Sequence, residues 1–348
     1  MTKKLFIVCA ALVWTVALVA QNIAVVSPEG ETSLFKSFTE AVDSAQAGSV
    51  IYLPGGTFSV RMTGYNNFKI TKKLTIIGIG HNTKRSDNPD GQTIIDGDLS
   101  FHTGSDGSAL MGCYVNGSLY IGIENSLYYN GTLTEVNDIL IRYNNISEGV
   151  FIIGSNSGTI INQNYMGRYC GEFNLSSGTA SSKSVIVTNN IIKKGVGGIR
   201  DSFFSDNVIL SYIASSDNPN NKGMIGCYRT SITNNIIFCG VENISECEFS
   251  GNMMAEDYDE DNINVGGEGF DWSSVFKKFD SNNPLNSDFH FKGNYTQYNG
   301  QVGIYAGDGF SDKQLAPVPY IVAKHVDEQT DAQGKLSIKV RVKAGDSE

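Results

Sequence analysis

The stretch Thr188-Asn189-Asn190-Ile191-Ile192 decides the fold, because it returns unchanged at residues 233–237. Looser copies occupy residues 142–146, 162–166, 205–209 and 250–254. One asparagine from each copy gives the alignment 145, 164, 190, 207, 235 and 252, with spacings of 19, 26, 17, 28 and 17 residues. A repeat of this size indicates one supersecondary unit stacked on its neighbours. Because each unit holds a short apolar run after a polar turn, the sequence predicts a solenoid of strands.

The asparagines are expected at turns, for two reasons. Asparagine tolerates a left-handed backbone, and its side chain bonds to local backbone groups. Asparagines stacked in neighbouring coils can also bond to one another, which satisfies polar groups in a tight corner. The apolar residues around them are expected to alternate between interior and solvent, and the predicted inward positions are Ile139, Ile141, Val185, Val187, Ile232 and Ile236.

The first residues are typical of an export signal. Lys3 and Lys4 precede an apolar run of 16 residues that ends at Ala20. A membrane-spanning helix needs about 20 residues. We therefore expect residues 1–20 to be a cleaved signal peptide and the mature chain to be exported, to the periplasm, the cell surface or the extracellular space. An uncleaved anchor is the alternative.

Acidity limits the partners. Without residues 1–20 the chain has 24 Lys and Arg against 36 Asp and Glu, a net charge of −12. Phosphate backbones bind to basic surfaces, so nucleic acid is excluded as a partner. Five cysteines remain, with no spacing typical of zinc, and we expect them to be small buried residues.

The entry to the solenoid carries a resemblance to a known family. Residues 33–46 are expected to form a helix, with Phe35, Phe38, Ala41, Val42 and Ala45 on one face. The string AVDSAQAGSVIYLPGGTFSV at 41–60 closely resembles the first coil of right-handed parallel β-helices in the pectin-lyase-like superfamily. The resemblance implies an all-β, right-handed parallel β-helix over residues 21–315, whose N-terminal helix covers the unpaired edges of the first coil.

The C-terminal end also has a counterpart. DFHFKGNYTQYNGQVGIYAGDGF at 288–310 is similar to the closing coil of secreted β-helix proteins common in Bacteroidetes. Residues 316–348 are then expected to be a β-hairpin cap over the second end of the solenoid, or the start of a small appended module.

Familiar enzyme signatures of this fold are missing. The chain has none of the four polygalacturonase motifs and no pectin methylesterase motif. Polysaccharide lyases leave no compact motif, because their base and their calcium ligands are spread over neighbouring coils. The catalytic candidates are Arg200, Asp201 and Lys193, and the ligand-binding candidates are Arg168, Glu172, Tyr212 and Arg229.

Arg200-Asp201 is the most suggestive pair, because it follows the glycine-rich run 195–198, where backbone could approach a ligand closely. A solvated ion pair at a coil corner is the alternative. The acidic run 256–261 could bind calcium, but it lacks the ligand spacing of a calcium loop, and a mobile solvated loop is the preferred interpretation. Gly78-Ile79-Gly80 has no third glycine and no following helix, so no dinucleotide is expected.

Aromatic residues leave the function open. Tyr165, Tyr169, Tyr212 and Tyr228 could stack on sugar rings or pack inside coils. The leading hypothesis is a carbohydrate-interacting protein that binds or presents a polysaccharide or glycan without cleaving it. A polysaccharide lyase or glycoside hydrolase with unfamiliar active-site residues is the second hypothesis, and an adhesin or structural spacer is the third. The oligomeric state is left open.

Overall fold

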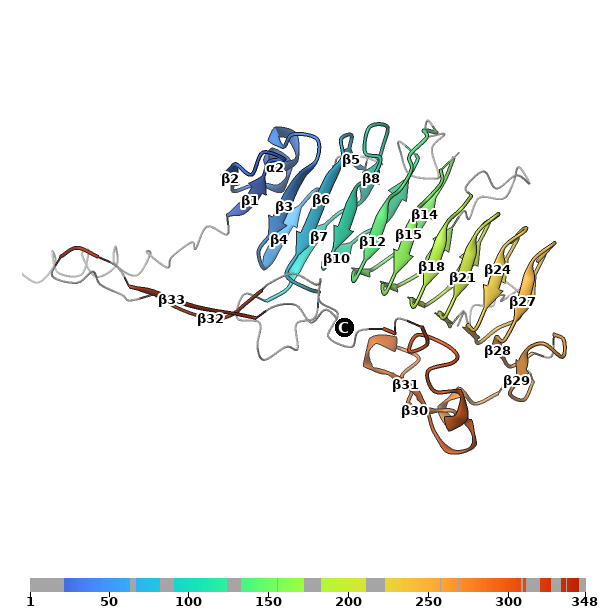
Figure 1. Ribbon diagram of the computed structural model, residues 1–348. Helices are drawn as coiled ribbons and strands as arrows, with labels where there is room; N and C mark the ends of the chain where they lie inside the picture. The colour runs from blue at the N-terminus through green and yellow to red at the C-terminus, as the bar shows by residue number, and fades with distance from the viewer. Residues whose placement is uncertain are drawn as a thin grey trace, which may run out of the picture.

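The chain folds as a parallel β-helix solenoid, in which successive coils stack to form three long sheets (Figure 1). The fold class predicted from the repeats is confirmed. The computed structural model describes residues 22–62, 67–81, 91–123, 133–154, 156–171, 183–210, 223–256, 258–267, 270–307, 309–310, 320–326, 333–335 and 337–343. The predicted signal peptide lies outside these residues. No helix in the described part is long and apolar enough to cross a membrane.

Each coil passes through the three sheets in the order A, B, C. Sheet A contains β2 (Thr32–Phe35), β1 (Ile23–Val26), β3 (Ser49–Leu53), β6 (Leu74–Gly78), β9 (Ala109–Met111), β12 (Leu140–Arg142), β15 (Ile160–Asn162), β18 (Ile186–Thr188), β21 (Phe203–Ser205), β24 (Ser231–Thr233) and β27 (Glu248–Ser250). Sheet B contains β4 (Gly56–Ser59), β7 (Thr93–Asp96), β10 (Tyr114–Asn116), β13 (Asn145–Ile146), β16 (Tyr165–Met166), β19 (Ile191–Ile192), β22 (Val208–Ile209), β25 (Ile236–Ile237), β28 (Met253–Met254) and β29 (Ile263–Asn264). Sheet C contains β5 (Phe68–Ile70), β8 (Leu99–Phe101), β11 (Leu119–Ile121), β14 (Val150–Ile152), β17 (Tyr169–Gly171), β20 (Gly195–Gly197), β23 (Met224–Ile225) and β26 (Val241–Glu242).

The interior of the coils is a continuous apolar core. Five of the six predicted inward residues belong to it, namely Ile139, Ile141, Val185, Val187 and Ile232. Ile236 was predicted to face the interior, and this prediction is wrong. Its neighbour Ile237 faces the interior, and the alternation along a strand turns Ile236 to the outer face of sheet B, where it is buried in a second core.

A ladder of buried asparagines lines the corner between sheets A and B. The backbone N–H and Nδ2 of Asn164 both donate to Oδ1 of Asn190, at 2.8 and 3.1 Å. The same pair of hydrogen bonds joins each residue to the next in the series Asn144, Asn164, Asn190, Asn207, Asn235, Asn252 and Asn262. The ladder therefore confirms the predicted bonding between stacked asparagines.

Two details of that prediction are wrong. The first aligned residue should be Asn144, because Asn145 lies in β13. The left-handed residue is also not the ladder asparagine but the one before it, with φ of 57° at Tyr143 and 53° at Asn189. The turn bends at that residue, which leaves the next side chain aimed into the corner.

Asp259 ends the ladder. It accepts hydrogen bonds from Nδ2 of Asn262 at 2.5 Å and from the backbone N–H of Asp261 at 3.1 Å. The described part of the acidic run is thus tied to the last coil rather than only solvated.

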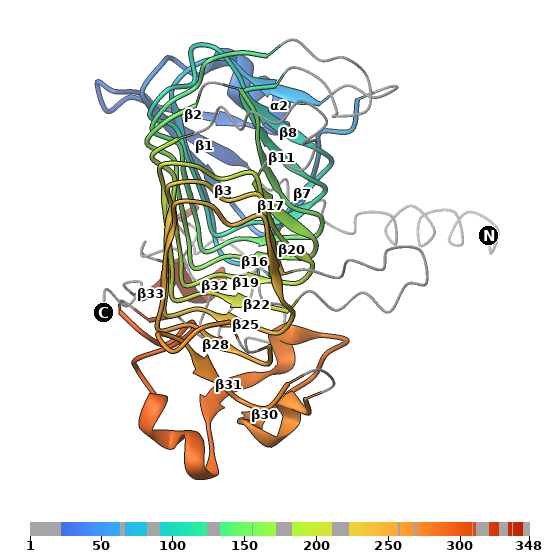
Figure 2. The ribbon, with the colours of Figure 1, turned by 90° about the vertical axis from the view of Figure 1, so that its right-hand side faces the viewer.

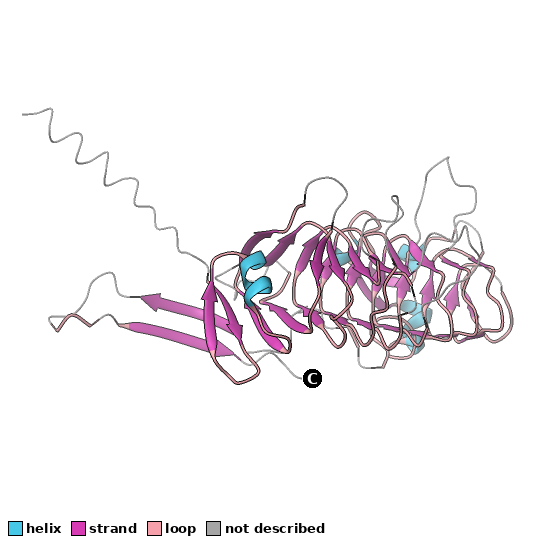
Figure 3. Cartoon of the chain, turned by 90° about the horizontal axis from the view of Figure 1, so that it is seen from above, coloured by secondary structure: helices cyan, strands magenta, loops and turns pink. Residues whose placement is uncertain are grey.

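The N-terminal end is closed by a helix, as predicted. Helix α2 (Phe38–Ser44) buries Phe38, Ala41 and Val42 in the interior core, and Figure 3 shows it beside the first strands. The helix is shorter than expected, because residues 32–35 form β2, which pairs antiparallel with β1. Ser37 begins the helix by accepting a hydrogen bond from the backbone N–H of Glu40.

Residues 270–310, here named the cover, lie on the outer face of sheet B (Figure 2). They contain the 3₁₀ turns η2 (Trp272–Ser274), η3 (Pro284–Asn286) and η4 (Gly293–Tyr298) and the antiparallel pair β30 (Phe276–Lys278) and β31 (Asp288–Phe291). The expectation that 288–310 forms a closing coil is wrong, because β31 joins none of the three sheets. Nδ2 of Asn189 holds the cover by donating to the carbonyl oxygens of Ile304 and Ala306, at 3.1 and 2.8 Å.

Two further predictions concern the C-terminal hairpin and the cysteines. Strands β32 (Tyr320–Val326) and β33 (Ile338–Lys343) pair antiparallel, and whether they cap the second end or begin another module stays a prediction.

Cys113, Cys170 and Cys227 are buried, as expected, and Cys239 and Cys247 are partly buried. Burial raises the pKa of the Cys113, Cys170 and Cys227 thiols to about 12.

Candidate functional site

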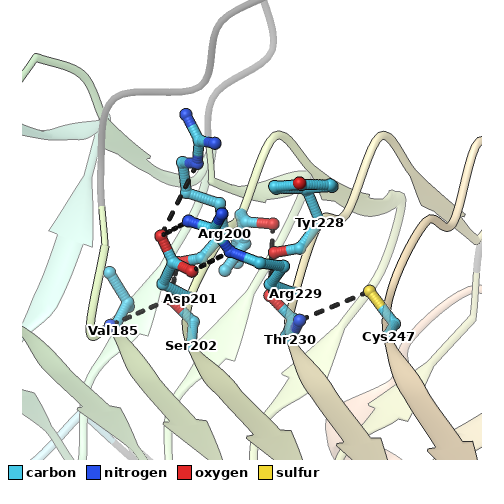
Figure 4. Close-up of polar contacts among 9 residues, drawn as sticks. Val185, Arg200, Asp201, Ser202, Tyr228, Arg229, Thr230 and Cys247 are labelled. Atoms are coloured by element: carbon cyan, nitrogen blue, oxygen red, sulfur yellow. Dashed lines mark hydrogen bonds and ion pairs between the residues drawn. The ribbon is translucent and has the colours of Figure 1, made fainter.

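Three of the residues singled out in the sequence meet at the corner between sheets C and A (Figure 4). The Arg229 guanidinium donates to both oxygens of Asp201, from Nε at 2.6 Å and from Nη2 at 2.8 Å. Nε of Arg200 lies 3.8 Å from the same carboxylate. Lys183, one coil earlier, pairs with Arg200 in a parallel bridge. We call Lys183, Arg200, Asp201, Arg229 and the adjacent Tyr228 the charged corner.

Tyr228 is covered by the two arginines. The guanidinium carbons of Arg200 and Arg229 lie 5.2 and 4.7 Å from its ring centroid. Such cation–aromatic contacts orient both side chains. The ring is therefore engaged by the protein's own groups, which favours the structural interpretation of this tyrosine.

Asp201 has a left-handed backbone, and so have the residues at the same position in its neighbouring coils. Its φ is 48°, while Asp138, Ser184, Arg229 and Glu246 have φ between 44° and 59°. Strained residues can mark functional sites. Here the strain repeats from coil to coil, so it belongs to the turn that joins sheet C to sheet A and does not single out Asp201.

The electrostatics of the corner favour a fixed ion pair. The hydrogen bond from Arg229 lowers the pKa of the Asp201 carboxyl, and the hydrogen bond to Asp201 raises the pKa of the Arg229 guanidinium. A general acid needs a pKa near the working pH. Asp201 is shifted away from that range, and both of its oxygens already accept hydrogen bonds.

Arg168 and Lys193 lie at the other edge of sheet C, at the corner with sheet B. Nε of Arg168 is 2.6 Å from Oε2 of Glu148. Nζ of Lys193 donates to the carbonyl oxygen of Asn282 at 3.1 Å, and so holds the cover. Burial lowers the pKa of Lys194, which lies over the ring of Tyr169 with Nζ 5.8 Å from the centroid. Sheet C separates these residues from Arg200 and Asp201, so the predicted catalytic set is not brought together.

Glu172 and Tyr212 lie outside the described residues. Within the described part, no group of three or more His, Cys, Asp or Glu side chains is arranged to hold a metal ion.

A different surface, on the outer face of sheet B, carries groups suited to ligand binding. Tyr114, Asn145 and Tyr165 occupy matching positions on β10, β13 and β16 and are half-buried. We call these three residues the tyrosine ladder. Their neighbours Val115, Ile146 and Met166 face the interior, so the ladder faces outward.

The tyrosine ladder begins where the cover ends. Beyond Tyr165 the same row continues as Ile191 and Val208, which are at most 2% exposed beneath the cover. Tyr165 borders this second core, and burial raises its pKa to about 12, with a smaller contribution from Tyr114. The row thus changes from aliphatic to amphipathic side chains at the edge of the cover.

A polar group adjoins the tyrosine ladder. Asp96 accepts hydrogen bonds from Nε and Nη2 of Arg61 and from Nδ2 of Asn116, each at 2.7 Å. Asn116 and Asp96 face each other on β10 and β7, two residues after Tyr114 and its partner Ile94. Hydrogen-bonding groups and an aromatic face therefore lie on the same side of the sheet.

Sequence reasoning named Tyr165 as a candidate for sugar stacking but missed Tyr114 and Asn145. The available signal was the register, because Tyr114, Asn145 and Tyr165 align with Ile191 and Ile236 only when the coils are paired strand by strand. A comparison of the chain with protein-family models, curated proteins and solved structures finds no match.

Proposed function

We propose that this protein binds an extended carbohydrate chain, without cleaving it, on the outer face of sheet B beside the cover. The observation that carries the proposal is the tyrosine ladder, in which two half-buried tyrosines flank an asparagine on three consecutive strands. Tyrosine offers a flat apolar ring with a polar tip, and an amide both donates and accepts hydrogen bonds. Sugar rings present apolar faces edged by hydroxyl groups, which these side chains complement.

The spacing suits an extended ligand. Neighbouring strands are about 4.8 Å apart, so Tyr114 and Tyr165 are separated by about 10 Å along the solenoid. A polymer lying along the solenoid axis would contact both rings and leave a hydroxyl-bearing edge toward Asn145. The Arg61, Asp96 and Asn116 group extends the polar surface at one side.

Binding is favoured over cleavage by the state of the candidate catalytic groups. Asp201 is held by Arg229 through two hydrogen bonds, and Lys193 donates to the backbone of the cover. Asp201 lies at the corner between sheets C and A, away from the tyrosine ladder on sheet B, whereas Lys193 follows Ile191, the strand partner of Tyr165. An enzyme of the polysaccharide lyase or hydrolase class remains the alternative, and an adhesin or spacer is the third candidate.

We also propose that the chain is related to the pectin-lyase-like superfamily and to the secreted β-helix proteins of Bacteroidetes, acting after export. The support is the resemblance of residues 41–60 and 288–310, together with the parallel β-helix fold.

The test is retention of the protein on a panel of immobilised plant, algal and host polysaccharides. Tyr114→Ala should weaken binding to the retained polymer by about tenfold, the loss expected when an aromatic contact worth about 1.5 kcal/mol is removed. Tyr52→Ala is the matched control, because Tyr52 is 43% exposed on the outer face of sheet A. Equal loss in both variants would contradict the assignment to sheet B.

Cleavage is tested on the same panel, with unsaturated products read by absorbance and reducing ends by a colour assay, with and without calcium. We expect no turnover. Turnover that disappears in Arg200→Ala or Asp201→Ala would establish the enzyme instead, and the absence of any binding would leave the spacer.

A further inference from the structure

The outer face of sheet A carries exposed apolar side chains beside an exposed lysine. Ile186 and Phe203 are 40% and 42% exposed on the neighbouring strands β18 and β21, and Ile160 on β15 is 37% exposed. Lys183 is exposed at the corner before β18, and its ammonium forms no hydrogen bond or ion pair with a described residue. Single exposed apolar residues are ordinary, whereas a contiguous set marks an interaction surface.

The basic and apolar residues are matched coil by coil. Lys183 precedes Ile186 by three residues, and Arg200 precedes Phe203 by three residues. Lys183 pairs with Arg200 in a parallel bridge, and Ile186 pairs with Phe203 between β18 and β21. A cation followed by an apolar side chain is therefore repeated on two neighbouring coils, about 4.8 Å apart. We call these four residues the basic–apolar patch.

The charges next to the patch leave it attractive to an anion. Arg229 and Asp201 neutralise each other through their two hydrogen bonds. The pKa of Asp201 is lowered first by the hydrogen bond from Arg229, and Arg200 and Lys183 add to the effect. Both cations of the patch thus lie within electrostatic reach of a carboxylate that Arg229 already holds.

The other acidic residues of this corner are further away. Asp138 lies two coils before Lys183, and Glu246 lies two coils after Arg200. Two coils span about 10 Å, which is about the Debye length at 0.1 M salt. An anion at the patch would therefore contact two cations, while most of the repulsion from the acidic chain is screened.

We propose that the basic–apolar patch binds a sulfated polysaccharide, whose sugar ring lies on the two apolar side chains and whose sulfate group lies between the two cations. An aromatic side chain offers a flat apolar face to a sugar ring. A sulfate ester has oxygens in three directions, so it can accept hydrogen bonds from cations on two coils at once. A planar carboxylate suits a single guanidinium fork, as Asp201 does with Arg229.

The shape of the patch suits a narrow polymer. The apolar row is one side chain wide, runs along the solenoid axis from Ile160 to Phe203, and ends at Ser231. A stable protein partner buries about 800 Å² on each side, which a row of this width does not offer. The patch is separate from the tyrosine ladder on sheet B, so the inference does not rest on the function proposed for that ladder.

The experiment is titration calorimetry of the full chain with dextran sulfate, unsulfated dextran and polygalacturonate, in about 0.1 M salt. Wild-type protein should bind dextran sulfate about tenfold more tightly than polygalacturonate and should not bind dextran. Lys183→Gln and Phe203→Ala should each weaken the binding of dextran sulfate about tenfold, because one removes a sulfate contact and the other removes the apolar contact with the ring.

Two matched variants control for charge and for apolar surface. Lys36→Gln removes the same charge from an exposed lysine after β2, and Leu34→Ala shortens a side chain that is 63% exposed on β2. Both should bind dextran sulfate like the wild type. The melting temperature should be unchanged in all four variants, because the four side chains are exposed.

Four results would overturn the proposal. Wild-type protein that does not bind dextran sulfate would do so, and so would an equal loss in Lys36→Gln and Lys183→Gln, which would indicate general ion exchange. Equal affinity for polygalacturonate would remove the assignment to sulfate. Binding to phosphatidylglycerol vesicles in place of dextran sulfate would assign the patch to a membrane.

The two carbohydrate sites are separated by one further variant. Tyr114→Ala should bind dextran sulfate like the wild type, because Tyr114 lies on sheet B. A loss of dextran sulfate binding in Tyr114→Ala, with none in Lys183→Gln, would place the sulfated polymer on the tyrosine ladder and overturn the assignment to sheet A.

Discussion

The outer faces of sheets A and B each present a row of large apolar side chains, and among the described residues only the row on sheet B is covered by another part of the chain. On sheet B, Ile191, Val208, Ile236 and Met253 are at most 2% exposed beneath the cover. On sheet A, Ile186 is 40% exposed at the matching outward position of the same coil as Ile191. Identical residue types in one coil thus have opposite environments.

The difference shows that apolar residues of a parallel β-helix become buried in two ways. Interior residues follow from the closure of the coil, whatever the chain does later. Outward apolar residues are buried only where another segment packs on them, and on sheet B that segment is residues 270–310, which bring Trp272, Phe276 and Phe289 onto the sheet. Phe238 stacks on Trp272 with ring centroids 4.1 Å apart, which seals the contact.

The largest expected effect separates the two rows directly. Ile236→Ala should destabilise the protein by about 2–5 kcal/mol, because it leaves a cavity between sheet B and the cover. Ile186→Ala should cost less than about 1 kcal/mol, because that side chain is already exposed. Urea denaturation of both variants gives the comparison.

The control for that experiment is the slope of each denaturation curve, which should match the wild type if the unfolded states are alike. Equal destabilisation by the two substitutions would mean that the cover contributes nothing to the burial of Ile236.

The next effect concerns the corner between the two faces. Asn207 lies in the middle of the asparagine ladder, and its amide accepts from Asn190 and donates to Asn235, at 3.0 and 2.9 Å. Asn207→Ala should cost about 1–3 kcal/mol, because buried groups in both neighbouring coils lose their partners. Asn145→Ala is the control, because Asn145 follows Asn144 but is not part of the asparagine ladder. It should lower the free energy of unfolding by less in the same denaturation assay.

The fold was predictable from the sequence because its signals are local and repeated. The TNNII repeat gave strands, turns and asparagine stacking, since each depends on a residue and its equivalent in the next coil. The side of Ile236 was not predictable, because a two-residue strand such as Ile236–Ile237 is apolar throughout and offers no alternation. Its burial on the outer face depends on the cover, which lies more than 30 residues later in the chain.

The candidate site was less predictable, again for a physical reason. Arg200 and Asp201 were singled out because they follow a glycine-rich run, Arg229 was a separate candidate, and the structure brings the three together. Their engagement with one another depends on which coils are neighbours, because Asp201 and Arg229 are 28 residues apart. The tyrosine ladder was hidden for the same reason, since its members meet only after the coils are paired.

The boundary between the covered and open parts of sheet B can be read from Tyr165. Its pKa of about 12 lies above the usual value of 10.0 because of burial. The native state therefore keeps this proton longer than the unfolded state, so its stabilising contribution is complete below pH 10.0 and is lost as the pH rises through about 12.

A spectrophotometric titration of the phenolates in native protein should lose one late-ionising tyrosine in Tyr165→Phe. Tyr114→Phe should keep the delayed step, because only Tyr165 borders the cover. If the number of late-ionising tyrosines is the same in Tyr165→Phe as in the wild type, the pKa of Tyr165 is not raised by the cover.

The smallest effect is expected at the last rung of the asparagine ladder. From the sequence alone, the position of Asp259 in an acidic run predicts that its replacement leaves the stability of the protein almost unchanged. In the structure it accepts hydrogen bonds from Asn262 and from the backbone of Asp261, and it is exposed. Water can replace an exposed acceptor, so Asp259→Ala should destabilise the protein by only about 0.5–1 kcal/mol, at the low end for a hydrogen bond. Glu260→Ala, next to it in the same turn, should change the denaturation midpoint less. A larger loss at Asp259 than at Asn207 would mean that the ladder is held mainly from its end rather than by burial along its length.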